Sequence, residues 1–232
     1  TKSLALTIDA FELTVQDALK VDASGVTLNY VPGSAANQSL AIVNSPGVTV
    51  TPLGIDGSAS KLELRENAFE IESATISGTG TVQAGSAFGF TNPVVTVTGF
   101  GVDYSNGGST NGTIDLSAEA VQVFSNSETY GASGTSVSGS LRFEGLDYKG
   151  IAFAAGAFEM DIASRVKFTG RDIQFQSKPA SGEYVAVFEN MEVELPGLAM
   201  SGNGGGFALN EAGSLVKLDS FLVNLAIGDS TS

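Results

Sequence analysis

The 232-residue chain contains no cysteine, no histidine and no tryptophan. Without cysteine it can form no disulfide, no thiol nucleophile and no Cys-x-x-Cys redox pair. Without histidine it lacks the commonest general base and a principal zinc ligand. These absences predict a protein that is not an enzyme and that has no cofactor.

Positive charge and long apolar runs are also scarce. Eleven Lys and Arg residues stand against 25 Asp and Glu residues, a net charge of −14. A negative field repels phosphate backbones, so we expect no nucleic-acid partner. No run of residues approaches the roughly 18 apolar residues of a membrane helix, so we expect no membrane span. The pI near 4.2, with few lysines and many Gly, Ser, Thr and Asn residues, favours an extracellular or cell-surface location. The start at Thr1, without Met or a signal peptide, suggests a processed form or a piece of a longer protein.

What the chain has is alternation of apolar and polar residues with a period of two, which is typical of β-strands with one face on a core. No window shows a helical period, and glycine, at 29 residues, interrupts most candidate helices. The sequence therefore predicts an all-β protein of many short strands. The alternating residues include Leu4, Leu6 and Ile8; Phe11, Leu13 and Val15; Val26, Leu28 and Tyr30; Leu62 and Leu64; Phe69 and Ile71; Ile114 and Leu116; Ile173 and Phe175; and Val223 and Leu225.

Dipeptides rich in Pro, Gly, Asn and Asp predict the turns between these strands. They are Pro32-Gly33, Pro46-Gly47, Asp56-Gly57, Asn106-Gly107-Gly108, Pro196-Gly197 and Asn203-Gly204-Gly205-Gly206. The segment IQFQSKPASGEYVAVF, with a Pro/Gly loop between two alternating runs, predicts a hairpin.

An internal repeat organises residues 1–232 as one repetitive β domain. Similar segments, each opening with two apolar residues around a third, usually acidic residue, begin near residues 11, 62, 114, 158 and 207. Between them, SLAIVNSPGVTVTPLG, SAFGFTNPVVTVTGFG and EYVAVFENMEVELPGLAMSG share a strand, a break marked by Asn or Pro, and a second strand. A unit of about fifty residues cannot bury its apolar face alone, so each unit needs a neighbour. We therefore expect an elongated repeat stack, either a parallel β-solenoid or stacked hairpins, with a β-sandwich as the alternative.

The segment EYVAVFENMEVELPGLAMSGNGGGFALNEAGS resembles repeats of very large secreted bacterial surface proteins of adhesin type. The shared pattern is Tyr/Phe-x-Val/Phe, Asn, Val-x-Val/Leu, Pro-Gly-Leu and Ser-Gly. This resemblance implies an extended, extracellular and non-catalytic array. It transfers no functional residue, because the shared residues are structural.

Acidic residues gather at three places, and we interpret them as solvated strand faces because most alternate with apolar residues. The alternative is that oxygen ligands at strand ends hold Ca²⁺, although no DxDxDG or GGxGxD loop occurs. A carboxylate pair for a β-helical polysaccharide-cleaving enzyme is a further alternative, and no pair stands out for that role. The three groups are Asp9, Glu12, Asp17 and Asp22; Glu63, Glu66, Glu70 and Glu72; and Glu189, Glu192 and Glu194.

One basic group could bind an anionic surface glycan. Arg165, Lys167 and Arg171 lie close in sequence, with Tyr184 or Phe175 as an aromatic surface on which a sugar could stack. Protection of an edge strand by charge is the preferred interpretation of these cations. The glycan site makes a carbohydrate-binding module the second functional hypothesis.

The first functional hypothesis rests on the ends of the chain. Residues Ser3 to Ile8 and Phe221 to Ile227 are apolar and lack an evident polar cap. Repeat stacks without caps associate end to end. We therefore predict a structural or adhesive module, or a fibre subunit, whose partners are neighbouring repeats or identical subunits.

Overall fold

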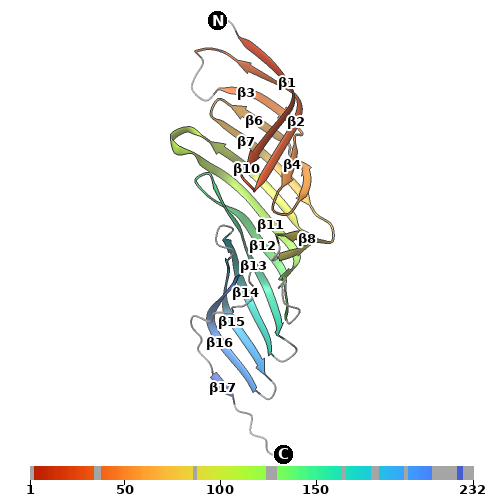
Figure 1. The fold of residues 1–232 in the computed structure, drawn as a ribbon, viewed down its shortest axis with the longest axis vertical. Helices are drawn as coiled ribbons and strands as arrows, with labels where there is room; N and C mark the ends of the chain where they lie inside the picture. Colours follow the sequence, from red (N-terminus) through yellow and green to blue (C-terminus); the bar gives the residue numbers. More distant parts are fainter. Residues whose placement is uncertain are drawn as a thin grey trace, which may run out of the picture. The chain divides into compact units, whose positions relative to one another are not determined.

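The computed structural model describes residues 3–33, 38–85, 88–123, 130–162, 166–178, 183–195, 198–210 and 224–226. Within these residues the chain forms strands β1 to β17 and one 3-10 turn, η1, at Ser105–Gly107, with no α-helix (Figure 1). The predicted all-β class is confirmed. The same residues contain no helix long and apolar enough to cross a membrane.

The strands differ in length, from three residues in β17 to 16 in β13. The first ten are β1 Leu4–Val15, β2 Leu19–Tyr30, β3 Ser39–Asn44, β4 Gly47–Val50, β5 Ile55–Ser58, β6 Lys61–Arg65, β7 Ala68–Ser77, β8 Thr81–Ala84, β9 Phe88–Thr91 and β10 Val94–Asp103. The others are β11 Ser109–Val123, β12 Tyr130–Glu144, β13 Asp147–Ile162, β14 Val166–Lys178, β15 Glu183–Leu195, β16 Leu198–Asn210 and β17 Asn224–Ala226.

The chain divides into two compact units whose segments alternate in sequence. The first unit comprises Thr1–Gly78, Val94–Leu116 and Ser140–Lys149. The second comprises Thr79–Pro93, Ser117–Gly139 and Gly150–Ser232. Strands β11, β12 and β13 contribute residues to both, so the units are not successive along the chain.

The first unit contains a four-stranded sheet in the order β1-β2-β4-β5 and a second row of strands in the order β10-β7-β6-β3. A single bridge between Ala59 and Ala74 joins the β5–β6 connection to β7. The core of this unit consists of aliphatic side chains with Phe69 and Phe100. Its most buried aliphatic residues include Leu19, Val50, Leu62, Ile71, Val97 and Ile114.

In the second unit, β13, β14, β15, β16 and β17 pair in chain order, and β9 pairs with both β8 and β11. Phenylalanines form its core. The ring of Phe153 stacks on Phe175 with centroids 4.8 Å apart, and it meets Phe88 and Phe90 edge to face at 5.1 Å and 5.2 Å. Such ring pairs contribute about 0.5–1.5 kcal/mol each beyond their buried area.

The strand pairings whose registers are described are antiparallel, as in stacked hairpins and unlike a parallel solenoid. The hairpin predicted in IQFQSKPASGEYVAVF is confirmed. Its two arms are β14 and β15, and Lys178 pairs with Glu183 beside the loop.

Two predicted turns are wrong, because their glycines lie inside strands. Asp56 and Gly57 belong to β5, and the turn before it spans residues 51–54 with Gly54 at φ +60°. A Cβ on Gly57 would lie 2.9 Å from Cγ1 of Ile76, so this glycine permits close packing of β5 on β7. Residues 203–206 lie within β16, whose pairing with β15 continues on both sides of them.

The predicted alternation is confirmed at most positions, but within several strands the buried row changes to the other sheet face. In β7 it changes from Phe69 and Ile71 to Ala74 and Ile76, and in the partner β10 from Val95 and Val97 to Phe100 and Val102. We call such a position a face switch. At this one, Gly99, with φ +54°, stands opposite Glu72.

A glycine opposite an acidic residue recurs in three further pairings. Gly25 stands opposite Asp9 in β1–β2, where the buried row also changes face. Gly156 stands opposite Asp172 in β13–β14, and Gly204 opposite Glu189 in β15–β16. In each case the flanking residue pairs keep one register, so no residue is inserted.

The repeat stays a prediction, although two of its segments share a backbone feature. Ser45 and Asn92 both adopt positive φ (54° and 48°) directly before a proline, at the break between β3 and β4 and between β9 and β10. The third segment has no such break at Asn190, since its two predicted strands are continuous in β15.

Candidate functional site

Strand β1 forms one edge of the four-stranded sheet and pairs only with β2 among the described residues (Figure 1). It contains the predicted open segment at the start of the chain. Leu4 and Leu6 are 65 % and 55 % exposed. Of the open segment predicted at the other end, the structure describes Asn224–Ala226, which form β17 at the end of the row of the second unit.

This apolar surface lies beyond the face switch at Asp9 and Gly25. Beyond it, Leu6 pairs with Leu28 and Leu4 pairs with Tyr30. Burial falls along β2, from the buried Val26 to the half-buried Leu28 and then to Tyr30, which is 41 % exposed. The row of apolar side chains on β2 is therefore buried at Val26 and exposed to solvent at Tyr30.

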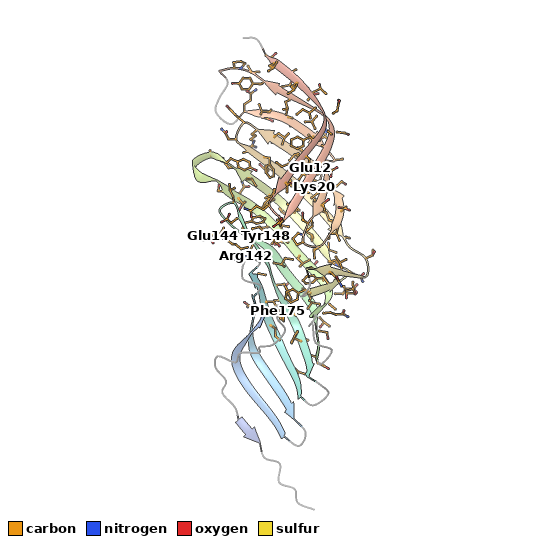
Figure 2. All side chains as sticks on the ribbon, in the orientation of Figure 1. Glu12, Lys20, Arg142, Glu144, Tyr148 and Phe175 are labelled. Atoms are coloured by element: carbon orange, nitrogen blue, oxygen red, sulfur yellow. The ribbon has the colours of Figure 1, made fainter. Side chains whose placement is uncertain are left out.

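Apart from Asp9, the charged residues of the β1–β2 hairpin lie between the face switch and the turn that joins the two strands. The Lys20 ammonium contacts Glu12 at 2.9 Å (Figure 2), and this hydrogen bond raises the pKa of Lys20. Both side chains are exposed, so the pair contributes little to stability. The outer half of the strand, Leu4 to Ile8, carries no charge.

A second group of charges lies on β6 and β7, where Glu63 is directly opposite Glu70. Two carboxylates at opposed positions repel each other, and Arg65 lies between them. Its Nε is 3.1 Å from Glu63 Oε1 and its Nη2 is 3.6 Å from Glu70 Oε2. The hydrogen bond from Arg65 lowers the pKa of Glu63. These acids, predicted as a solvated face, are held in salt bridges on that face.

Other cations of the first unit are also close to acids. Lys61 lies 3.7 Å from Glu72, and Lys149 lies 3.5 Å from Asp147 and 3.7 Å from Glu144. Among the residues that the structure describes, no group of three or more acidic side chains is arranged to hold a metal ion.

The predicted glycan-binding residues lie on β14 and β15 of the second unit, except Arg165, which is outside the described residues. Lys167 pairs with Asp161 on one side and with Glu194 on the other. Arg171 pairs with Ala157 and Asn190. The register thus places acidic residues on both sides of Lys167 and uncharged residues beside Arg171.

The register also separates the aromatic residue from the cations. Tyr184 pairs with Ser177, ten residues along β14 from Lys167, which corresponds to about 33 Å. Phe175, the alternative stacking residue, is buried in the phenylalanine core at 1 % exposure and cannot receive a sugar. A glycan site at Arg165, Lys167, Arg171 and Tyr184 stays a prediction, and it would need an extended ligand.

Tyr30 and Leu28 complete the open surface, and the sequence predicted them only as a strand. The sequence did contain a signal for this open surface. The alternating residues change from even positions (Leu4, Leu6, Ile8) to odd positions (Phe11, Leu13) inside one strand, which indicates a change of face.

Comparison of the chain with protein-family models, with curated proteins and with solved structures gives no match. The functional argument therefore rests on the residues and their geometry.

Proposed function

We propose that the chain is a non-catalytic structural or adhesive module of the cell exterior that assembles end to end with neighbouring repeats or identical subunits. In this proposal, units of about fifty residues stack through their antiparallel hairpins. The observation that carries it is the open outer half of β1, where Leu4 and Leu6 are 65 % and 55 % exposed.

Free sheet edges normally carry features that prevent pairing with another chain, such as lysine, proline or a bulge. The segment from Leu4 to Ile8 contains no charge and no proline, and its register with β2 is continuous. An edge of this kind can accept a further strand. The absence of histidine and cysteine, the acidic pI and the Gly/Ser/Thr-rich composition support the non-catalytic and extracellular parts of the proposal.

Sedimentation velocity over a range of protein concentrations tests the assembly. We expect the wild-type sedimentation coefficient to rise with concentration through a series of oligomers. Leu6→Lys places a charge on the edge and should raise the concentration needed for association by at least about tenfold, roughly 1.4 kcal/mol.

Tyr104→Lys is the matched control, because it replaces an exposed apolar residue (51 %) outside β1. It should associate like the wild type. A monomer at every concentration in the wild type, or equal weakening by both substitutions, would contradict the proposed function.

A further inference from the structure

The outer half of β1 is complementary to itself. Leu4, Leu6 and Ile8 alternate with Ala5 and Thr7, so the segment reads alike in both directions around Leu6. An antiparallel pairing centred on Leu6 would place Leu4 opposite Ile8 of the other copy and Ala5 opposite Thr7. Each of the large apolar side chains Leu4, Leu6 and Ile8 would then face another large apolar side chain, which is an arrangement that stabilises cross-strand pairs.

Other centres along β1 are less favourable. Centring on Ala5 or Thr7 would directly oppose two pairs of large apolar side chains, whereas centring on Leu6 opposes three. Centring on Ile8 would place Leu4 opposite Glu12, and centring on Asp9 or Glu12 would place like charges directly opposite each other, which destabilises a pair. With Leu6 at the centre, Asp9 faces Ser3 and Glu12 lies beyond the paired segment. A single register is therefore favoured for two copies.

We propose that β1 is a two-fold symmetric interface at which a second copy of this chain adds its own β1, antiparallel, with Leu6 opposite Leu6. The inference rests on the proposed function, because β1 is the edge at which copies would meet. It adds the orientation and the register. It also means that any longer assembly needs a second contact elsewhere, since a two-fold contact closes on itself.

We assign a second copy of the chain to this edge, because the sequence of β1 itself has the properties that a partner strand needs. A partner must be uncharged over five residues, apolar at alternate positions and able to pair in the antiparallel direction. In the first unit, the partner strand β2 meets the same requirements from Val26 to Tyr30 and already pairs with β1 in that way.

Cysteine cross-linking in the full-length protein tests the register, since the natural chain contains no cysteine and any disulfide must join two copies. Directly opposed residues in an antiparallel pair have Cα atoms about 4.5–5.5 Å apart, within disulfide range. Leu6→Cys should therefore form a covalent dimer under oxidised glutathione, at least about fivefold faster than Tyr104→Cys, the exposed control outside β1.

Leu4→Cys or Ile8→Cys alone should not exceed that control, because the two sulfurs of each variant would lie four residues apart, about 13 Å. A mixture of these two variants should form the mixed dimer, because position 4 then faces position 8. Equal cross-linking of all the variants would overturn the symmetric register.

Failure of the register and failure of the proposed function are distinguishable. Concentration-dependent association without Leu6→Cys cross-linking would retain the assembly and overturn this interface, as when β17 or another segment of a second copy covers β1. A cross-linked dimer that never grows further would retain the interface and contradict end-to-end assembly. A monomer without cross-links would overturn both.

Discussion

Gly25 and Gly99 occupy equivalent positions in two different strand pairs. Each has positive φ (63° and 54°), each faces an acidic residue, and the buried row changes face at each. A side chain at positive φ is strained even where space is free. These two glycines thus fix where the sheet changes the face that it turns to the core.

Gly25→Ala should lower the free energy of unfolding by about 1–2 kcal/mol, because no heavy atom lies within 4 Å of the added Cβ and only backbone strain acts. Urea denaturation followed by circular dichroism measures the change. Gly156→Ala is the control. Gly156 has no positive φ and its Cβ would make an ordinary 3.4 Å contact with Ser136. Equal destabilisation by both substitutions would show that φ at Gly25 does not matter.

Glycine also shows how far single residues could be predicted. The sequence indicated glycine-marked turns, and Gly33 and Gly107 lie in turns or bends as expected. Gly57 and Gly204 were misassigned, because a glycine inside a strand has the same sequence signature as a turn glycine. Whether a glycine lies in a turn or inside a strand depends on its partner strand, such as β7 for Gly57. The local sequence does not show which strand that is.

At the scale of elements, the β1–β2 turn is tied to the β12–β13 turn within the first unit. Gln16, at φ +44°, accepts a hydrogen bond from the Tyr148 backbone N–H at 2.6 Å, and its amide donates to Asp147 at 3.3 Å. The Tyr148 ring packs on Phe143 with centroids 5.6 Å apart. Burial, with a smaller contribution from the charge of Asp17, raises the pKa of the Tyr148 hydroxyl.

This shift predicts a loss of stability in alkali. Above the ordinary tyrosine pKa of about 10, the unfolded chain releases the Tyr148 proton while the folded chain keeps it, so the free energy of unfolding falls as pH rises. Urea midpoints measured at pH 8 and at pH 11 should differ less in Tyr148→Phe than in the wild type, with similar midpoints at pH 8. An unchanged pH dependence in the variant would contradict the burial of this hydroxyl.

The positions of the strands were predicted better than the choice of partner for each strand. Alternation located β6, β7 and β11 correctly, because each buries every second residue over part of its length even where the buried row changes face. It could not show that β7 pairs with β10 across the β8–β9 hairpin, since the choice of partner depends on contacts distant in sequence. The basic residues illustrate the same limit. The sequence analysis assigned Lys167 and Tyr184 to one site. In the β14–β15 register, however, the residue paired with Tyr184 lies ten residues along β14 from Lys167.

At the scale of the whole molecule, the net charge of −14 opposes the association that we propose for the β1 edge. The opposing forces differ in their response to salt. Repulsion between two acidic copies is screened as ionic strength rises, since the Debye length falls from about 10 Å at 0.1 M to about 3 Å at 1 M. Apolar contact at Leu4, Leu6 and Ile8 is not weakened by sodium chloride.

Association should therefore strengthen with salt, by about tenfold in Kd between 0.1 M and 1 M sodium chloride, as measured by sedimentation velocity. Asp9→Asn, which removes the charge nearest to the apolar segment, should strengthen association at 0.1 M and have little effect at 1 M. Leu6→Lys should associate more weakly than the wild type at both salt concentrations, because salt does not restore the lost apolar contact. If salt instead dissolves the wild-type assembly, charged contacts hold the copies together, and the apolar half of β1 is not where they meet.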